Sequence, residues 1–207
     1  MSHTTPAHPP PLSAALDTIR HLYTLLAVTQ SRAVNIPLFL LHDVLQRFLG
    51  AQRLAPAELS AAVVLLQHVA FFAAGGTNAI SSIDLSSAYN GVAGFRAGPV
   101  ALLTFVSNWA APIYWAVAAA GLLARRSRSS GAGDAPSSPY VAHVAVLTLF
   151  ATAAVAAVMA ACTALRTHLF VWTVFSPKYL YCIAWELGMH LGVNVGLGGL
   201  LYGLGTL

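Results

Sequence analysis

FFAAGGTNAISSIDLSSAYNGV, residues Phe71–Val92, is the longest polar, turn-rich run between two strongly apolar ones. Gly75 and Gly76 break a helix, because glycine loses more conformational freedom on folding than any other residue. Serine, asparagine and aspartate side chains follow, and these residues favour caps and turns over helix interiors. Irregular backbone is tolerated in a membrane only at the interface, inside protein or beside a wet cavity. The run therefore predicts a polar cap, residues 75–92, between two membrane segments, where a polar ligand or a soluble domain would bind.

The composition is that of an integral membrane protein. Hydrophobic residues make up 57% of the 207 residues and charged residues only 8%, whereas soluble domains are about 25% charged. The mean hydropathy is +0.72. The net charge is +4, but the basic residues are dispersed or lie in loops, which suits membrane topology. Nucleic-acid binding would need a basic stripe on one face, so no nucleic-acid partner is expected. Cys162 and Cys182 lie in apolar runs and are interpreted as buried thiols.

Four apolar segments approach or exceed the roughly 20 residues that a spanning helix needs: 57–74, 98–124, 140–165 and 183–207. Pro37–Gly50 is shorter, and its His42, Asp43, Gln46 and Arg47 form a polar face at helical spacing. This pattern indicates a short or tilted fifth span packed inside a bundle. The predicted fold is an all-α, polytopic transmembrane helix bundle with four spans and this short fifth one.

The chain is divided into two parts. Residues 1–30 are expected to form a Pro- and His-rich disordered leader without a signal peptide, followed by a marginal interfacial helix. Residues 31–207 are expected to form the transmembrane domain, with a flexible cytoplasmic loop at 125–139. Pro112 predicts a kink in the span 98–124, and Glu186 and His190 could pair at i, i+4 spacing.

Glycines repeat every fourth residue near the carboxy terminus, at Gly188, Gly192 and Gly196 and again at Gly199 and Gly203. Such small-residue faces let helix backbones approach closely.

The positive-inside rule orients the bundle. Arg125, Arg126 and Arg128 form the strongest basic loop, which is therefore predicted to be cytoplasmic. The cap and the aromatic junction 166–181 then both face the opposite side of the membrane.

No complete catalytic centre is visible in the sequence. P-loop, GxGxxG and HExxH motifs are missing. Ser81, His168 and Asp84 could be combined into a Ser/His/Asp set, but nearly any polar protein contains such residues. Metal-assisted phosphoryl transfer would need several grouped Asp, His or Glu ligands. We therefore predict no catalytic residue, no metal ligand and no cofactor in this chain. His68 is a packing residue or, since polar groups inside a bilayer are expensive, a functional one.

Lipid headgroup or substrate binding is the site hypothesis that remains. Cations and amides on the predicted non-cytoplasmic side could contact a phosphate or a polar headgroup. The candidates are Asn78, Asp84, Asn90, Arg166, His168 and Lys178. The alternative is plain anchoring, because basic and aromatic residues at an interface need no ligand, and asparagines often serve as turn residues.

Three runs carry a family resemblance: GGTNAISSIDLSSAYNGV (75–92), SRAVNIPLFLL (31–41) and LRTHLFVWTVFSPKYLY (165–181). They resemble the carboxy-terminal membrane region of fungal GPI ethanolamine phosphate transferases, the type 2 enzymes more closely than type 3. The third run, with its Arg-x-His-Leu-x-x-Trp and Phe-x-Pro-Lys pattern, is the most specific. The resemblance covers residue 31 to the end.

The resemblance implies an endoplasmic reticulum membrane enzyme that moves phosphoethanolamine from phosphatidylethanolamine to a mannose of the GPI precursor. It also implies that catalysis resides in a luminal amino-terminal domain of alkaline-phosphatase type, with zinc and a Thr nucleophile. No residue of this chain matches those positions, so none is carried over. The chain is expected to be a fragment, or a short protein without transferase activity of its own.

A second hypothesis is a non-enzymatic membrane subunit or scaffold, which would pack against a partner membrane protein through its glycine faces. A small-molecule transporter is less favoured, because the sequence has no internal repeat. The expected partners are thus membrane lipids, with phosphatidylethanolamine and the GPI precursor reached through the full-length enzyme, and a possible partner subunit.

Overall fold

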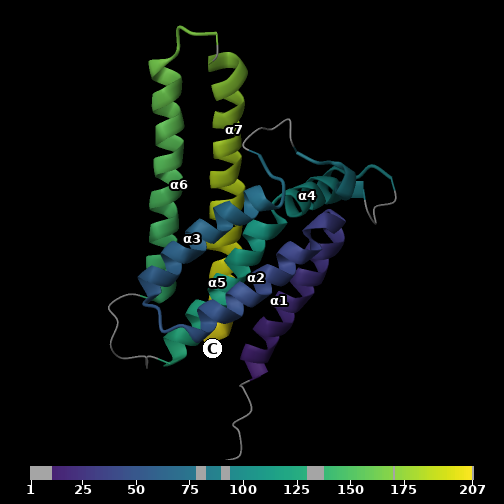
Figure 1. Cartoon of the computed structure of the whole chain (residues 1–207), viewed down its shortest axis with the longest axis vertical. Coiled ribbons are helices and arrows are strands. Elements are labelled where there is room, and N and C mark those ends of the chain that lie inside the picture. The colour runs from purple at the N-terminus through teal and green to yellow at the C-terminus, as the bar shows by residue number, and fades with distance from the viewer. Residues whose placement is uncertain (1–10, 78–82, 90–93, 130–137, 170, 207) are drawn as a thin grey trace, which may run out of the picture.

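The computed structural model describes residues 11–77, 83–89, 94–129, 138–169 and 171–206. Every regular element in this described part is helical (Figure 1), which confirms the all-α class. In chain order the elements are α1 (Pro11–Gln30), η1 (Ala33–Asn35), α2 (Ile36–Ala51), α3 (Pro56–Ala73), η3 (Ser86–Tyr89), α4 (Ala97–Asn108), α5 (Ala110–Ser129), α6 (Pro139–Ala164), η4 (Val171–Phe175), α7 (Ser176–Ala184), η5 (Trp185–Leu197) and α8 (Gly198–Thr206).

Helix α5 is the centre of the bundle. Its residues 110–120 and 122–124 are all buried, and it packs against α1, α3 and α8. Apolar residues surround this helix on every side as far as Ala124, which is the pattern of a helix buried in a core. Tyr114, Trp115 and Leu123 are fully enclosed. Helix α6 is the opposite case, since only 17% of its most apolar window is buried in the chain, and the rest of its surface suits lipid.

Three helices are long and apolar enough to cross a membrane: Pro56–Ala73, Pro139–Ala164 and a continuous helix over Val171–Thr206. The bent pair α4 and α5 makes a fourth span if its two halves are counted together. These correspond to the four predicted spans. Helix α2, the predicted short fifth span, has 16 residues and is not among these candidates. Asp43 and Gln46 on its polar face bond Arg20 of α1.

The break between α4 and α5 differs from the predicted kink at Pro112. The two helices meet at an angle of 78°, and α4 already ends at Asn108. A proline ring clashes with the carbonyl group four residues earlier, which here belongs to Asn108. The break therefore falls one turn before the proline, and its size turns the expected single span into two helices.

The predicted junction 166–181 is wrong in its second half. The structure is helical from Val171 onward, through the π-helical η4 and into α7. The wide π-turn comes directly before Pro177, and such turns accommodate interruptions of the helical hydrogen-bond ladder. A helix of 36 residues is about 54 Å long, so with α6 it forms a helical hairpin longer than the roughly 30 Å hydrocarbon core. Figure 1 shows this hairpin rising well beyond the other helices.

A charged network joins the middle parts of α1 and α2 to the last third of α5. Asp43 accepts from Arg20 (2.6 Å) and from Arg47 (2.7 Å). Asp17 accepts from Arg125 (2.7 Å) and lies 4.0 Å from Arg20 Nε. Arg20 is buried and also donates to Gln46 Oε1 (3.0 Å). These contacts hold α1 within the bundle, where it packs along α5 and α8.

Candidate headgroup site at the cap

The cap begins where α3 is stopped by two glycines. Gly75 has a φ of +89°, a conformation that only glycine adopts without strain. The Gly75 N–H donates to the Phe72 carbonyl and the Gly76 N–H to the Phe71 carbonyl, both at 3.0 Å. This pair of bonds is the Schellman ending of a helix. The expected role of Gly75 and Gly76 as helix breakers is confirmed.

Asn108 holds the other side of the cap. Its amide oxygen accepts from the Asp84 N–H (2.9 Å), and its amide nitrogen donates to the Asp84 carbonyl oxygen (2.8 Å) and to the Thr104 carbonyl oxygen (2.9 Å). Asn108 is the last residue of α4, so the break before Pro112 places its side chain at the cap. One side chain thus clamps both backbone groups of Asp84.

The Asp84 carboxylate faces Arg32, which lies between α1 and η1. Arg32 Nε and Nη2 both donate to Asp84 Oδ2, at 3.3 and 3.2 Å. Asp84 Oδ1 accepts from the N–H (2.9 Å) and the hydroxyl (2.6 Å) of Ser86. The two Ser86 hydrogen bonds, and then Arg32, hold the pKa of Asp84 below its usual value. The carboxylate is therefore ionised at neutral pH.

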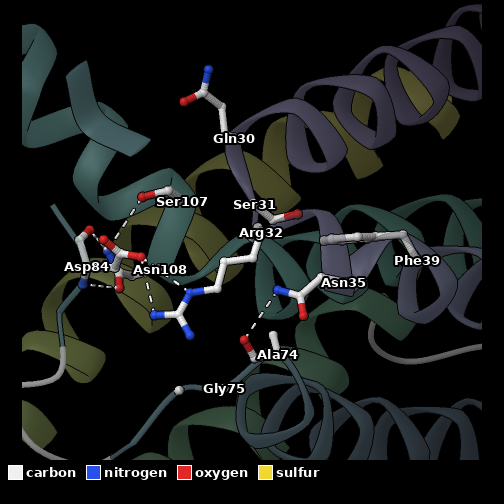
Figure 2. A pocket seen from close by; sticks show the side chains of 12 residues that line it. Gln30, Ser31, Arg32, Asn35, Phe39, Ala74, Gly75, Asp84, Ser107 and Asn108 are labelled. Carbon is white, nitrogen blue, oxygen red and sulfur yellow. Dashed lines mark hydrogen bonds and ion pairs between the residues drawn. The ribbon is translucent and has the colours of Figure 1, made fainter. Parts of the chain in front are cut away.

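A small polar pocket lies around this ion pair (Figure 2), with a cavity volume of about 40 Å³. Asn35 donates to the Ala74 carbonyl on its far side (3.3 Å). Gln30 Oε1 and Ser31 Oγ are buried and have no hydrogen-bond partner among the described residues. The pocket is lined by Gln30, Ser31, Arg32, Asn35, Phe39, Ala74, Gly75, Gly76, Asp84, Ser107, Asn108 and Ala110. It therefore offers a cation, an anion and spare acceptors within one hollow.

A second, apolar groove lies between α3, α6 and α7, with a volume of about 300 Å³. Lys178 and Glu186 are its charged residues, and its α6 wall consists of Phe150 and of smaller alanine and valine side chains. His68 lines it as well, with Nδ1 bonded to the Val64 carbonyl (2.8 Å) and its ring 4.5 Å from that of Phe150. A long apolar groove with a cation at its rim suits a lipid chain with a phosphate above it.

An aromatic wall separates the polar pocket from the groove. Trp109 and Tyr181 stack with ring centroids 5.8 Å apart, and Phe71 lies 5.7 Å from Tyr181. A small cavity on the cap side of this wall is lined by all three rings together with Gly76 and Asn108. The wall links α3, the α4–α5 break and α7.

The structure divides the predicted site residues among different places. Asp84 lies in the polar pocket and Lys178 at the groove, whereas Arg166 and His168 are exposed at the tip of the α6–α7 hairpin. Asn78 and Asn90 lie outside the described residues. Sequence reasoning missed Arg32 as a site residue, although it belongs to the run SRAVNIPLFLL that carried the family resemblance.

Glu186 and His190, which were predicted to pair, form no hydrogen bond with each other in the described part of the chain. His190 Nε2 lies 2.9 Å from the Thr148 hydroxyl, and Glu186 Oε2 is buried without a hydrogen-bond partner in the described part of the chain. The wider π-helical turns of η5 alter the i, i+4 spacing on which the prediction relied. Among the residues that the structure describes, no three His, Cys, Asp or Glu side chains gather to hold a metal ion.

Apolar helices long enough to span, a buried central helix and a polar cap define a multi-pass membrane protein. A sequence model of the GPI ethanolamine phosphate transferase membrane region matches residues 3–207. The chain belongs to this family and corresponds to its membrane region.

Named relatives agree with this assignment. The chain is 46% identical over 172 residues to GPI ethanolamine phosphate transferase 2 of Aspergillus oryzae, covering 83% of this chain and 19% of that protein. It is 45% identical over 165 residues to the Aspergillus fumigatus protein of the same name (80% and 20%), and 35% identical over 205 residues to that of Yarrowia lipolytica (83% and 24%). The chain thus spans about a fifth to a quarter of the length of these relatives. No solved structure matches it significantly.

Proposed function

We propose that this chain acts as the membrane portion of an enzyme that adds phosphoethanolamine to a mannose of the GPI precursor in the endoplasmic reticulum membrane. Its role is to hold lipid-linked substrates beside a luminal catalytic domain. The match to the family's membrane region supports this function. The observation that carries the lipid-holding role is the α3–α6–α7 groove with Lys178 at its rim.

The groove has the chemistry of a lipid site. Its walls are apolar along α6. An acyl chain could therefore leave the bilayer or the protein surface and bind in a groove that fits its shape. Lys178 lies near the start of α7, about two turns above Trp185 and Glu186 along the same continuous helix, and so closer to the hairpin tip. A lysine at that height attracts a lipid phosphate as a point charge. The groove therefore fits one acyl chain below a phosphate.

Zinc chemistry would belong to a catalytic domain and not to this part of the enzyme. The family resemblance implies zinc, but the described residues offer no donor set for it. We propose that the membrane portion only holds the substrates in position.

The test is Lys178→Ala in the full-length enzyme, with phosphoethanolamine transfer measured in membranes. Loss of one charge-assisted hydrogen bond predicts transfer lowered about tenfold at limiting lipid substrate. Arg166→Ala, at the exposed hairpin tip, is expected to lower transfer less. Arg53→Ala is the matched control, because Arg53 is an exposed cation in the turn between α2 and α3. Unchanged transfer in Lys178→Ala would leave this lysine as a membrane anchor and remove the groove from the function.

A scaffold role remains the second candidate, favoured by one observation. Gly188 packs inside the chain, where a Cβ would come within 2.8 Å of Phe105. Gly192 and Gly196 are exposed on η5, and a Cβ added at either would meet only its own helix within 4 Å. Such a face suits close approach of a partner helix. Co-purification of one stable membrane partner that is lost on Gly192→Leu would support this role.

A further inference from the structure

We propose that the Arg32–Asp84 pair is the binding site for a zwitterionic aminoethyl phosphate headgroup, with the phosphate on Arg32 and the ammonium on Asp84. This inference rests on the proposed function and names the chemistry that the cap would recognise. The ligand is the headgroup of phosphatidylethanolamine, or the same group carried on a glycan. The headgroup would replace the internal ion pair with two complementary ones.

Arg32 is placed to exchange its partner. Two of its nitrogens share the single oxygen Asp84 Oδ2 at 3.2 and 3.3 Å, longer than the 2.7–2.9 Å or so of strong charge-assisted bonds. The planar guanidinium fork matches two oxygens of a phosphate better than one oxygen of a carboxylate. The Arg32 side chain is also 60% exposed, so a headgroup can reach it from outside.

Asp84 keeps its position when Arg32 turns away. Asn108 clamps its backbone, and Ser86 occupies Oδ1 through two hydrogen bonds. Of the two carboxylate oxygens, Oδ2 is the one that Arg32 holds. A primary ammonium has three N–H donors, so it can bind Oδ2 and still donate to further acceptors. Gln30 Oε1 and Ser31 Oγ, which are buried and have no partners among the described residues, line the same pocket, but both point away from Asp84 in Figure 2.

The surroundings also suit the lipid form of the ligand. Helix α2 leads away from the pocket with an apolar ridge at i, i+4 spacing, formed by Ile36, Leu40, Val44 and Phe48. Each of these side chains is at least 41% exposed, so acyl chains have an apolar surface to follow below the headgroup. The site predicts selectivity, because trimethylammonium cannot donate hydrogen bonds to Asp84 and phosphatidylcholine should bind poorly.

The experiment uses the 207-residue chain, purified in detergent and exposed to equal amounts of dioleoyl phosphatidylethanolamine and dioleoyl phosphatidylcholine. Bound lipids are counted by native mass spectrometry. We expect about tenfold preference for the ethanolamine lipid, the size of one charged hydrogen bond. Asp84→Asn should abolish this preference, and Arg32→Gln should lower the binding of both lipids, because both carry the phosphate; neither change should alter the melting temperature. Arg47→Gln, which removes an exposed cation from the far half of α2, should keep the preference.

Soluble phosphoethanolamine and phosphocholine separate the two sources of the headgroup. Displacement of the bound lipid by phosphoethanolamine alone supports a site that also accepts a glycan-borne group. Retention of the lipid against both compounds, together with the tenfold preference, supports a site for the membrane lipid. Equal binding of the two lipids by the unaltered chain would overturn the proposal. A preference that survives Asp84→Asn, or binding of both lipids that Arg32→Gln leaves unchanged, would also overturn it.

This binding result is separable from the proposed function. If Lys178→Ala lowers transfer in the full-length enzyme while the chain binds both lipids equally, only the headgroup site fails. If the preference is present but transfer is unaffected by Lys178→Ala, the groove fails and the headgroup site stands.

Discussion

Two regions of the bundle hold arginine–aspartate contacts of opposite character. Between the middles of α1 and α2, Arg20 bonds Asp43 at 2.6 Å, and the Arg20 side chain is only 10% exposed. At the cap, Arg32 bonds Asp84 at 3.2 Å, and its side chain is 60% exposed. A buried charge depends on its partner, because without one it stays desolvated. An exposed pair contributes only about 0–1 kcal/mol. The first arrangement therefore holds helices together, and the second can be given up for a ligand.

The largest expected effect comes from breaking the buried network. Arg20→Ala leaves Asp43 with Arg47 alone and Gln46 without its donor, so we expect a loss of about 3 kcal/mol in unfolding free energy. Thermal unfolding in detergent micelles measures it. The control is Arg47→Ala, which removes a 68% exposed partner of the same Asp43 and should cost less than about 1 kcal/mol. Equal losses in the two variants would show that burial does not distinguish these contacts.

A smaller effect is expected from the clamp that positions the cap. Asn108→Ala removes three hydrogen bonds and leaves the part-buried backbone groups of Asp84 without these partners, at a cost of about 1–3 kcal/mol. Hydrogen exchange should accelerate in residues 83–89 and stay constant in α6. Asn108→Asp keeps the acceptor and should show about half of the change. Protection that is unaltered in both variants would remove Asn108 from the cap's structure.

The smallest effect is the pH response of the cap. Ser86 first, and then Arg32, lower the pKa of Asp84 in the folded state. The stabilisation is therefore complete above the unfolded pKa of about 3.9, and it is lost as the pH falls through the lower folded value. Exchange at Ser86, corrected for its intrinsic rate, should be constant from neutral pH to about pH 5 and rise below about pH 4. Asp84→Asn should remove this dependence, and a rise already between pH 7 and pH 5 would contradict the assignment.

Local sequence rules predicted several helices and where they end. The helix stop at Gly75–Gly76 and the spans 57–74 and 140–165 followed from glycine conformation and apolar length. Pro112 signalled an interruption, but its position and 78° angle depend on the carbonyl group one turn earlier and on the packing of α4 against the cap. The continuous helix through Lys178 was missed, because Ser176 and Pro177 read locally as a stop and the π-turn before them has no simple sequence signal.

The candidate site was predicted in part. Asp84 was recognised as the carboxylate of the cap, and Lys178 as a cation near a lipid surface. Arg32 was not, since its contact with Asp84 spans 52 residues and nothing in the local pattern indicates it. The sequence placed Asp84, Arg166, His168 and Lys178 on the same side of the membrane as headgroup candidates but could not say which of them lie together. The structure places Asp84 in the polar pocket, Lys178 at the groove and the other two at the exposed hairpin tip.

By itself, the sequence determined that this is an all-α membrane protein, where its polar cap begins and to which family it belongs. These properties depend on hydropathy, on glycine and proline stereochemistry and on short matching runs, all of which are local. Only the tertiary structure decided which arginine meets which aspartate, which of those pairs is buried, and that α3, α6 and α7 enclose a groove. Those features arise when residues distant in the chain are brought together by packing, and no local pattern encodes that geometry.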